Sequence, residues 1–270
     1  MAGRDADIDA YRDAESVLRS HRWRTTENSA GYLLPHLTPG TSLLDVGCGP
    51  GTLTVDLAAH VAPGRVVGLD VTPQIVERAR VHAAQVGASE VTFVAGDLHE
   101  LALPPASFDI VHAHQVLQHL PDPVAALRSM GMLVRPGGLV AARDVMYSSL
   151  AWAPRDPRLD RWREIYVAVT RHNGAEADAG IFLPLWAADA GLGDIVYSSS
   201  TWTYASPGDR AWWGELWAER LLASELADQA ITYGVATAEE LAEVAAGWRE
   251  WAAAPVGAFV VTHGEVIARA

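Results

Sequence analysis

A run of nine residues constrains the fold of this chain most strongly: Leu43-Leu44-Asp45-Val46-Gly47-Cys48-Gly49-Pro50-Gly51. An apolar segment ends there on an acid, and three glycines follow at alternate positions. Because glycine lacks a Cβ atom, such a turn allows positive φ angles and close approach of a ligand. Apolar residues then recur every four positions, at Leu53, Leu57 and Val61, as on one face of a helix. The pattern predicts a buried strand that turns sharply into a helix whose N-terminus faces a nucleoside-type ligand.

Four more apolar segments predict further strands of the same sheet. They span residues 65–70, 91–95, 108–112 and 139–145. Helical segments lie between them, and the first of these is expected to begin with Thr72 as N-cap and to face the sheet through Ile75, Ala79 and Val86. Strands that alternate with helices in this way are typical of an α/β fold with a mostly parallel sheet.

The second predicted strand ends in an acid, Asp70, which lies 19 residues after Gly51. A carboxylate at that strand tip can accept hydrogen bonds from both hydroxyl groups of an adenosine ribose. The glycine spacing is G-x-G-x-G, whereas the dinucleotide fingerprint is G-x-G-x-x-G, and Thr52 occupies the position of its third glycine. The spacing therefore argues against a nicotinamide cofactor.

The stretch 45–51 resembles motif I of the class I S-adenosylmethionine-dependent methyltransferases, whose usual form is (E/D)-x-G-x-G-x-G. The segments around Asp70 and Asp97, and segments 108–123 and 133–145, match the later motifs of that family in order. The ubiquinone- and menaquinone-biosynthesis branch of small-molecule methyltransferases is the most similar. The resemblance is close over about residues 40–146. It implies a Rossmann-like, seven-stranded, mostly parallel sheet with helices on both faces, an antiparallel last strand beside the fifth, and helical insertions that form a cap.

The resemblance also implies a site for S-adenosylmethionine, which the reaction converts to S-adenosylhomocysteine. Asp45 would either bond the cofactor ammonium directly or hold the loop amides or a bridging water. Asp97 would accept the adenine amino group, with the Leu98 backbone at the ring edge, and His114 and Gln115 would lie at the methionine end. The expected cofactor residues are Asp45, Gly47, Gly49, Gly51, Asp70, Val71, Asp97, Leu98 and His114.

Two residues after the fourth strand, Gln115 and His119, are candidates for the chemistry at the methyl acceptor. A histidine with a near-neutral pKa can serve as a general base. His119 also precedes Pro121-Asp122-Pro123, so a hydrogen-bonded structural role at the start of the next helix is the favoured alternative. Arg24 is a candidate for the cofactor carboxylate, although a surface position is favoured for it. The histidine spacings match no zinc motif, and no metal site is expected.

The remaining segments predict the domain organisation. Residues 1–40 are expected to form an N-terminal helical lid, in which Ile8, Tyr11 and Leu18 indicate one helix and Thr26 caps a second. Residues 41–270 are expected to form the methyltransferase domain, with helical insertions at about 146–183 and 206–254. Pro184 is expected to begin the helix that returns to the sheet. Residues 258–262 are expected to form the last strand.

The two insertions contain seven of the ten tryptophans: Trp152, Trp162, Trp212, Trp213, Trp217, Trp248 and Trp251. They either pack the insertion helices together or line an apolar, aromatic chamber for the acceptor. The sequence leaves both interpretations open.

The net charge of −13, from 20 basic and 33 acidic residues, argues against nonspecific nucleic-acid binding. We expect no secretory signal and no membrane span, and therefore a cytoplasmic enzyme, with a homodimer left open. The predicted activity is methyl transfer from S-adenosylmethionine to a small, apolar or aromatic metabolite by in-line displacement. The alternatives are a nicotinamide-dependent oxidoreductase and a non-catalytic binding protein with the methyltransferase fold.

Overall fold

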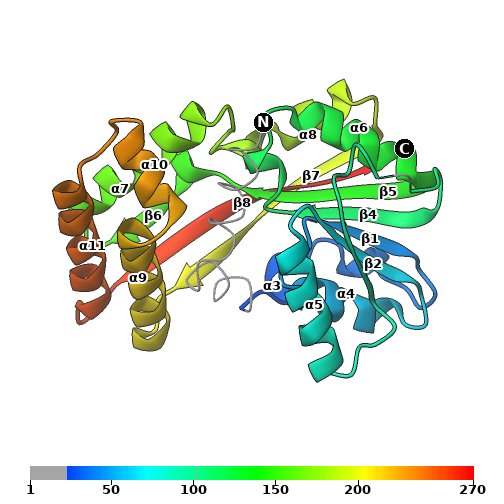
Figure 1. The fold of residues 1–270 in the computed structure, drawn as a ribbon, viewed down its shortest axis with the longest axis horizontal. Coiled ribbons are helices and arrows are strands. Elements are labelled where there is room, and N and C mark those ends of the chain that lie inside the picture. The colour runs from blue at the N-terminus through cyan, green and yellow to red at the C-terminus, as the bar shows by residue number, and fades with distance from the viewer. Residues whose placement is uncertain (1–22, 102) are drawn as a thin grey trace. The chain divides into compact units, whose positions relative to one another are not determined.

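A computed structural model describes residues 23–101 and 103–270, and contacts within it divide the chain into two compact units (Figure 1). Within the described residues, the sheet unit comprises residues 23–145, 178–200 and 263–270. The helical unit comprises residues 146–177 and 201–262. The helix expected around Ile8, Tyr11 and Leu18 lies outside the described residues.

Parallel strands form most of the sheet, in the order β3-β2-β1-β4-β5, and β8 follows β5. Their bounds are β1 Leu43–Val46, β2 Val66–Asp70, β3 Thr92–Ala95, β4 Phe108–His114, β5 Val134–Val145 and β8 Ala258–Arg269. Strand β8 pairs with β5 in antiparallel register, with Leu139 opposite Arg269 and Val145 opposite His263. The predicted antiparallel last strand beside the fifth is confirmed.

The structure differs from the sequence prediction in two strands: β8 is longer than predicted, and β6 is additional. Strand β7, Gly193–Tyr204, pairs with β8, which continues seven residues beyond the predicted end at Thr262. Strand β6, Ala151–Ala153, pairs with the first residues of β8 inside the helical unit. The described part of the chain therefore holds eight strands, and the predicted number of seven is wrong. Three residues are too few to show the alternation that identifies a strand.

Helices cover both faces of the sheet unit, as the prediction required (Figure 1). One face carries α3 Thr26–Ser29, η1 Leu34–His36, α4 Thr52–Val61 and α5 Pro73–Gln85, and the other carries α6 Pro123–Leu133 and α8 Ala179–Asp189. Because successive strand residues point to opposite faces, Leu43 packs with Leu57 of α4 and Leu44 packs with Leu127 of α6. The Rossmann-like α/β architecture is confirmed.

Helix α8 begins five residues earlier than predicted, because Pro184 lies inside it rather than at its start. A proline has no N–H to donate to the carbonyl four residues earlier, which here belongs to Gly180. That carbonyl oxygen lies close to Gly264 of β8, where an added Cβ would come within 2.0 Å of it. The neighbouring strand thus approaches the helix at the turn that the proline leaves open.

Two local predictions near helix ends are also wrong. Thr25, and not Thr26, caps helix α3, because the Thr25 side chain accepts a hydrogen bond from the Asn28 N–H. Val86 is 55% exposed, since α5 ends at Gln85 and Ala83 takes the last buried position of its inner face. Both predictions differ from the structure by one residue at a helix end.

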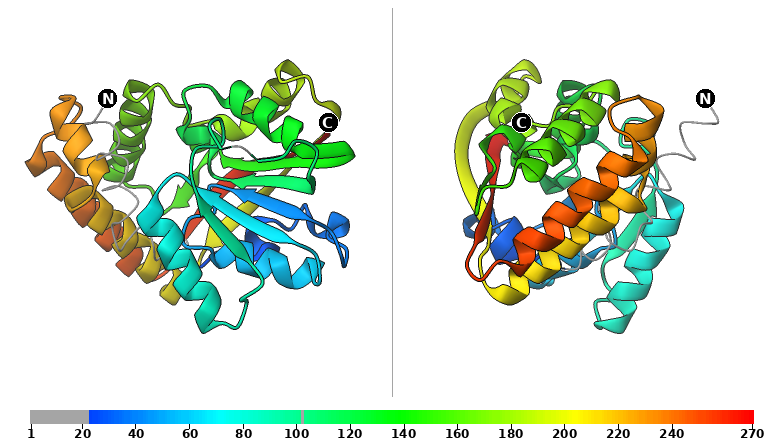
Figure 2. Two further views of the ribbon diagram at one scale, coloured as in Figure 1. Left: turned by 45° about the vertical axis from the view of Figure 1, so that its right-hand side comes forward. Right: turned by 90° about the vertical axis from the view of Figure 1, so that its left-hand side faces the viewer.

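The helical unit consists of η3 Tyr147–Ser149, α7 Pro157–His172, α9 Pro207–Leu222, α10 Glu225–Thr232 and α11 Ala238–Ala253, together with β6. Helices α9 and α11 lie side by side in both views of Figure 2. Gly214 permits this close approach, because a Cβ there would come within 2.6 Å of the Ala252 methyl group. Helix packing in this unit therefore depends on a small residue at the crossing point.

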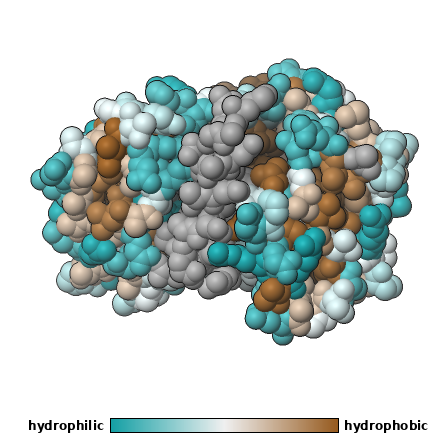
Figure 3. Space-filling view, in the orientation of Figure 1, coloured by the Kyte–Doolittle hydropathy of each residue, from teal (hydrophilic) through white to brown (hydrophobic). Residues whose placement is uncertain are grey.

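The tryptophans of the insertions form the core of the helical unit. Six of the seven are at most 6% exposed: Trp152, Trp162, Trp213, Trp217, Trp248 and Trp251. The Trp162 ring lies edge-to-face on Trp217 and Trp248, with centroid distances of 4.5 and 4.9 Å. Mostly hydrophilic residues surround smaller apolar areas on the face of this unit seen in Figure 3. For these six residues the packing interpretation is confirmed.

Among the described residues, no helix combines the length and apolar character that a membrane span needs.

Candidate functional site

The glycine-rich loop connects β1 to α4 with a bare backbone. Gly47, Gly49 and Gly51 have φ angles of +67°, +55° and +79°, in the left-handed region that favours glycine. A Cβ on Gly47 would come within 2.3 Å of the Val116 side chain, and one on Gly51 would come within 2.9 Å of Phe93. A larger residue at either position would be strained by its φ angle and would have to displace a neighbouring side chain.

Asp70 lies at the tip of β2 and holds the loop in place. Its Oδ2 accepts a hydrogen bond from the Gly49 N–H at 3.1 Å, and its Oδ1 accepts one from the Thr72 N–H at 3.1 Å. The side chain is buried. One carboxylate therefore orders both the glycine-rich loop and the start of α5, and it does so at the strand end where the ribose contact is predicted.

Asp45, at the end of β1, makes two contacts that differ from those considered from the sequence. Its Oδ2 accepts a hydrogen bond from the Thr54 hydroxyl at 2.6 Å, and its Oδ1 accepts one from His112 Nδ1 at 2.9 Å. All three side chains are buried. Because the carboxylate oxygen accepts, His112 carries a proton on Nδ1. The acid thus links α4 to β4 beneath the glycine-rich loop.

His114, two residues further along β4, is held by a buried ion pair. Its Nε2 lies 2.9 Å from Arg143 Nη1, and Arg143 Nε lies 3.2 Å from Glu265 Oε1. Since a guanidinium group can only donate, Nε2 is the acceptor and the neutral ring carries its proton on Nδ1. Burial lowers the pKa of His114 well below its usual range, and the charges of Arg24 and Arg143 lower it further. His114 is therefore neutral at pH 7 and cannot supply a positive charge.

Gln115 follows β4 in the left-handed conformation, with a φ of +54°, which is uncommon for a residue other than glycine. Its Oε1 accepts a hydrogen bond from Arg24 Nη2 at 2.7 Å, and its Nε2 lies 3.0 Å from His263 Nε2. Because an amide nitrogen only donates, His263 Nε2 is the acceptor. The strained residue therefore joins the segment before α3 to strand β8.

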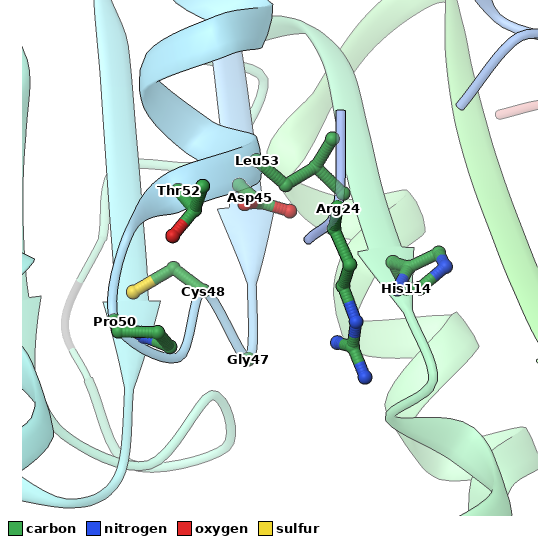
Figure 4. A pocket seen from close by; sticks show the side chains of 8 residues that line it. All are labelled: Arg24, Asp45, Gly47, Cys48, Pro50, Thr52, Leu53 and His114. Atoms are coloured by element: carbon green, nitrogen blue, oxygen red, sulfur yellow. The ribbon is translucent and has the colours of Figure 1, made fainter. Parts of the chain in front are cut away.

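These elements enclose a small pocket over the glycine-rich loop (Figure 4). Figure 4 shows the Arg24 side chain extending between the loop and His114. The cavity volume is about 10 Å³, enough for about one water molecule. The lining consists of Arg24, Asp45, Gly47, Cys48, Pro50, Thr52, Leu53 and His114. Arg24, for which the sequence favoured a surface position, is half-buried in this lining.

The other expected cofactor residues lie at neighbouring strand ends, outside this lining. Val71 follows β2 and is 44% exposed. Asp97 and Leu98 follow β3, where Asp97 is exposed and its Oδ1 accepts a hydrogen bond from the His99 N–H at 2.7 Å. The Gly96 N–H donates to the Asp70 carbonyl at 2.9 Å, so the ends of β2 and β3 are joined. The predicted residues thus share the carboxyl edge of the parallel strands.

His119 ends the short helix η2, Leu117–His119, and is exposed. Its Nε2 lies 3.0 Å from Gln118 Nε2. The Gln118 amide is oriented by its Oε1, which accepts the Val145 N–H at 3.2 Å, so its nitrogen donates to the imidazole. In this arrangement His119 Nε2 already acts as a hydrogen-bond acceptor.

The sequence did not reveal the buried partners of these residues. The contacts that Asp45 makes with His112, and that His114 makes with Arg143, join different strands. The register that brings them together, with Asp45 opposite His112 and His114 opposite Arg143, becomes visible only in the paired sheet. Polar residues inside apolar strands were the available signal, because a buried charge needs a partner.

Comparisons with known proteins place this geometry in a family. A family described as a methyltransferase domain matches residues 37–183. An uncharacterized methyltransferase of Schizosaccharomyces pombe is 31% identical over 275 residues, which cover 96% of this chain and 94% of that protein. A ubiquinone biosynthesis O-methyltransferase of Neisseria meningitidis is 38% identical over 102 residues, which cover 37% of this chain and 42% of that protein.

A solved structure shows the same fold. Phosphoethanolamine N-methyltransferase 2 of Haemonchus contortus, in complex with S-adenosylhomocysteine, has a TM-score of 0.60 at 16% identity, and the match covers 97% of this chain and 59% of that one. The family match and the nearly full-length relative confirm the predicted class and decide against the nicotinamide alternative. The protein is an enzyme whose cofactor is S-adenosylmethionine, and the chain belongs to the class I S-adenosylmethionine-dependent methyltransferases.

Proposed function

We propose that this methyltransferase methylates a small, apolar or aromatic metabolite by in-line displacement. The observation that carries the proposal is the bare-backbone loop at residues 47–51, tied to a carboxylate at the tip of β2. The net charge of −13 disfavours nucleic acid as the acceptor. A relative over 102 residues is named for ubiquinone biosynthesis, which points to a small aromatic acceptor.

The residues present fit the cofactor. We assign the loop glycines Gly47, Gly49 and Gly51 to close backbone approach and Asp70 to the ribose hydroxyls. When bound, S-adenosylmethionine supplies a methyl group already activated on a sulfonium. The protein then has to align the two reactants and exclude water, which lowers the barrier through orientation. Further assigned contacts come from Asp45, Val71, Asp97, Leu98 and His114.

Cofactor binding requires the pocket to widen from the present volume of about 10 Å³. Arg24 is the natural element to move, because it extends across the pocket and its hydrogen bond to Gln115 joins two flexible side chains. We assign Arg24 to the cofactor carboxylate after this movement. A guanidinium group pairs well with a carboxylate, and two parallel hydrogen bonds would offset the loss of the bond to Gln115.

We assign Gln115 and His119 to the acceptor side, because both belong to the turn after β4. An alcohol or phenol acceptor must lose a proton as its oxygen bonds to the methyl carbon and the carbon–sulfur bond breaks. His119 would accept that proton once its Nε2 exchanges the Gln118 amide for the acceptor hydroxyl. His114 is excluded from this task, since Arg143 occupies the nitrogen that lacks a proton.

A transfer assay tests the proposed acceptor class. S-adenosylmethionine with a labelled methyl group is incubated with the protein and with separate panels of phenols, aliphatic amines and tRNA. We expect labelled product from the phenol panel and none from tRNA. Label in the amine panel alone would contradict the proposed acceptor.

Replacing His119 with alanine tests the base. We expect kcat to fall by about a hundredfold or more, in the range of general-base catalysis, while S-adenosylhomocysteine affinity stays unchanged. His119→Gln is the matched control, because it offers a hydrogen-bond acceptor to Gln118 but no base. A kcat within threefold of wild type for both variants would leave His119 with a structural role alone.

A further inference from the structure

A buried acid at the end of β5 holds the turn that follows β4. Asp144 is fully buried, and its Oδ1 accepts a hydrogen bond from the Gln118 N–H at 3.2 Å. The backbone N–H groups of Val116 and Leu117 also favour the charged form of this carboxyl group and lower its pKa. In return, the Gln118 side chain accepts the Val145 N–H at 3.2 Å. We call this reciprocal arrangement of Asp144, Val145 and Gln118 the clasp.

The turn held by the clasp is the part of the chain that lies over the glycine-rich loop. Val116 packs on Gly47 so tightly that a Cβ there would overlap the valine methyl group. Gln115 starts the turn and bonds to Arg24 in the pocket lining. A shift of the turn would therefore move Val116 relative to the glycine-rich loop. It would also move Gln115 relative to Arg24.

We propose that Asp144 is a positioning residue, which fixes the 115–119 turn against the glycine-rich loop and thereby sets cofactor affinity without touching the cofactor. The proposal rests on the assignment of the cofactor to that loop. It gives the clasp a role in binding that the sequence did not indicate, since no predicted site residue lies on β5.

The protonation state of Asp144 determines which variant can replace it. Burial raises its pKa to about 8, against the opposing effect of the backbone N–H groups and of Arg143, so the acid is mostly neutral at pH 7. The charge of Asp144 also contributes to the raised pKa of Tyr32. Asp144 Oδ2 has no hydrogen-bond partner among residues 23–101 and 103–270. Asparagine, a neutral group of the same shape, should therefore preserve the clasp, and alanine should remove it.

Two measurements on Asp144→Ala and Asp144→Asn test the proposal. Backbone amide exchange of Gln118 and Val145 reports the clasp itself, and calorimetry with S-adenosylhomocysteine reports the pocket. We expect about tenfold faster exchange and a roughly fivefold loss of affinity in Asp144→Ala, with both values near wild type in Asp144→Asn. If the alanine variant does not fold, Asp144→Ser, which keeps a shorter acceptor, should show smaller changes in the same direction.

Two other outcomes are distinguishable. Faster exchange with unchanged affinity, or an equal loss of affinity in the alanine and asparagine variants, would overturn the positioning role and leave the cofactor assignment intact. A wild-type protein that does not bind S-adenosylhomocysteine would instead overturn the assignment on which the proposal rests.

Discussion

Replacing Trp162 with alanine should lower the free energy of unfolding by about 3–5 kcal/mol, the usual cost of deleting a large buried aromatic side chain. Trp162 is fully buried at the centre of the helical unit. Its ring contacts Trp217, Trp248 and Phe259, with centroid distances of 4.5 to 6.0 Å. The alanine variant loses all of these ring contacts and leaves a cavity between Trp217, Trp248 and Phe259. Urea unfolding followed by near-ultraviolet circular dichroism measures the loss.

Trp162→Phe is the matched control, because it keeps one six-membered aromatic ring and loses the five-membered part of the indole with its N–H. That N–H has no hydrogen-bond acceptor within the described part of the chain, so its loss should cost little. We expect this variant to lose less stability than Trp162→Ala, because the phenyl ring leaves a smaller cavity than the methyl group of alanine does. A stable Trp162→Ala variant that methylates its acceptor poorly would contradict the packing role and restore the aromatic-chamber interpretation for this residue.

The stability of the wild-type protein should fall as the pH rises through the titration of Asp144. Burial raises the pKa of Asp144 from 3.8 to about 8 in the folded protein, so the folded state retains a proton that the unfolded chain has already released. This difference of about four pH units corresponds to roughly 6 kcal/mol in total. Between pH 6 and pH 8 it amounts to about 2 kcal/mol, and above pH 8 less than about 1 kcal/mol remains to be lost from this group.

Asp144→Asn removes this dependence, because an amide is neutral at every pH in the range. Urea unfolding of both proteins at pH 6, 7 and 8 gives the difference in their free energies of unfolding, in which the contributions of the histidines cancel. We expect the wild type to lose about 2 kcal/mol more than the variant over this interval. If the free energies of unfolding of the two proteins changed equally with pH, Asp144 would be ionised in the folded protein at pH 6. That result would contradict a raised pKa for Asp144.

The sequence predicted the parts of this fold that depend on local patterns. The glycine spacing at 47–51 is tied to positive φ angles, and the apolar segments formed the parallel strands in the expected order. The start of helix α8 was misplaced because a proline is typical of the first turn of a helix. The open turn at Gly180 contacts Gly264, which lies 84 residues further along the sequence. Three-residue strand β6 is defined only by its pairing with β8.

Some residues of the candidate site could likewise be found from local sequence patterns, and others could not. Asp70 could be found because its role depends on its position at a strand tip. Arg143, Glu265 and Asp144 could not, since their partners lie on other strands or, for Asp144, in helix η2, and their burial follows from tertiary packing. Arg24 was underrated for the same reason: its contact with Gln115 spans 91 residues of sequence. Polar residues within otherwise apolar strands were the one local sign of this buried network.

Calorimetric titration with S-adenosylhomocysteine tests the central claim, that the loop at 47–51 and Asp70 bind the adenosine-bearing cofactor. We predict that the wild type binds and that Asp70→Ala binds at least about tenfold more weakly, because it loses charge-assisted hydrogen bonds to the ribose and the bond that orders Gly49. Asp194→Ala, which removes an exposed acid from β7, should bind like the wild type. Equal affinities of the wild type and a folded Asp70→Ala variant, or no binding by either, would contradict the account.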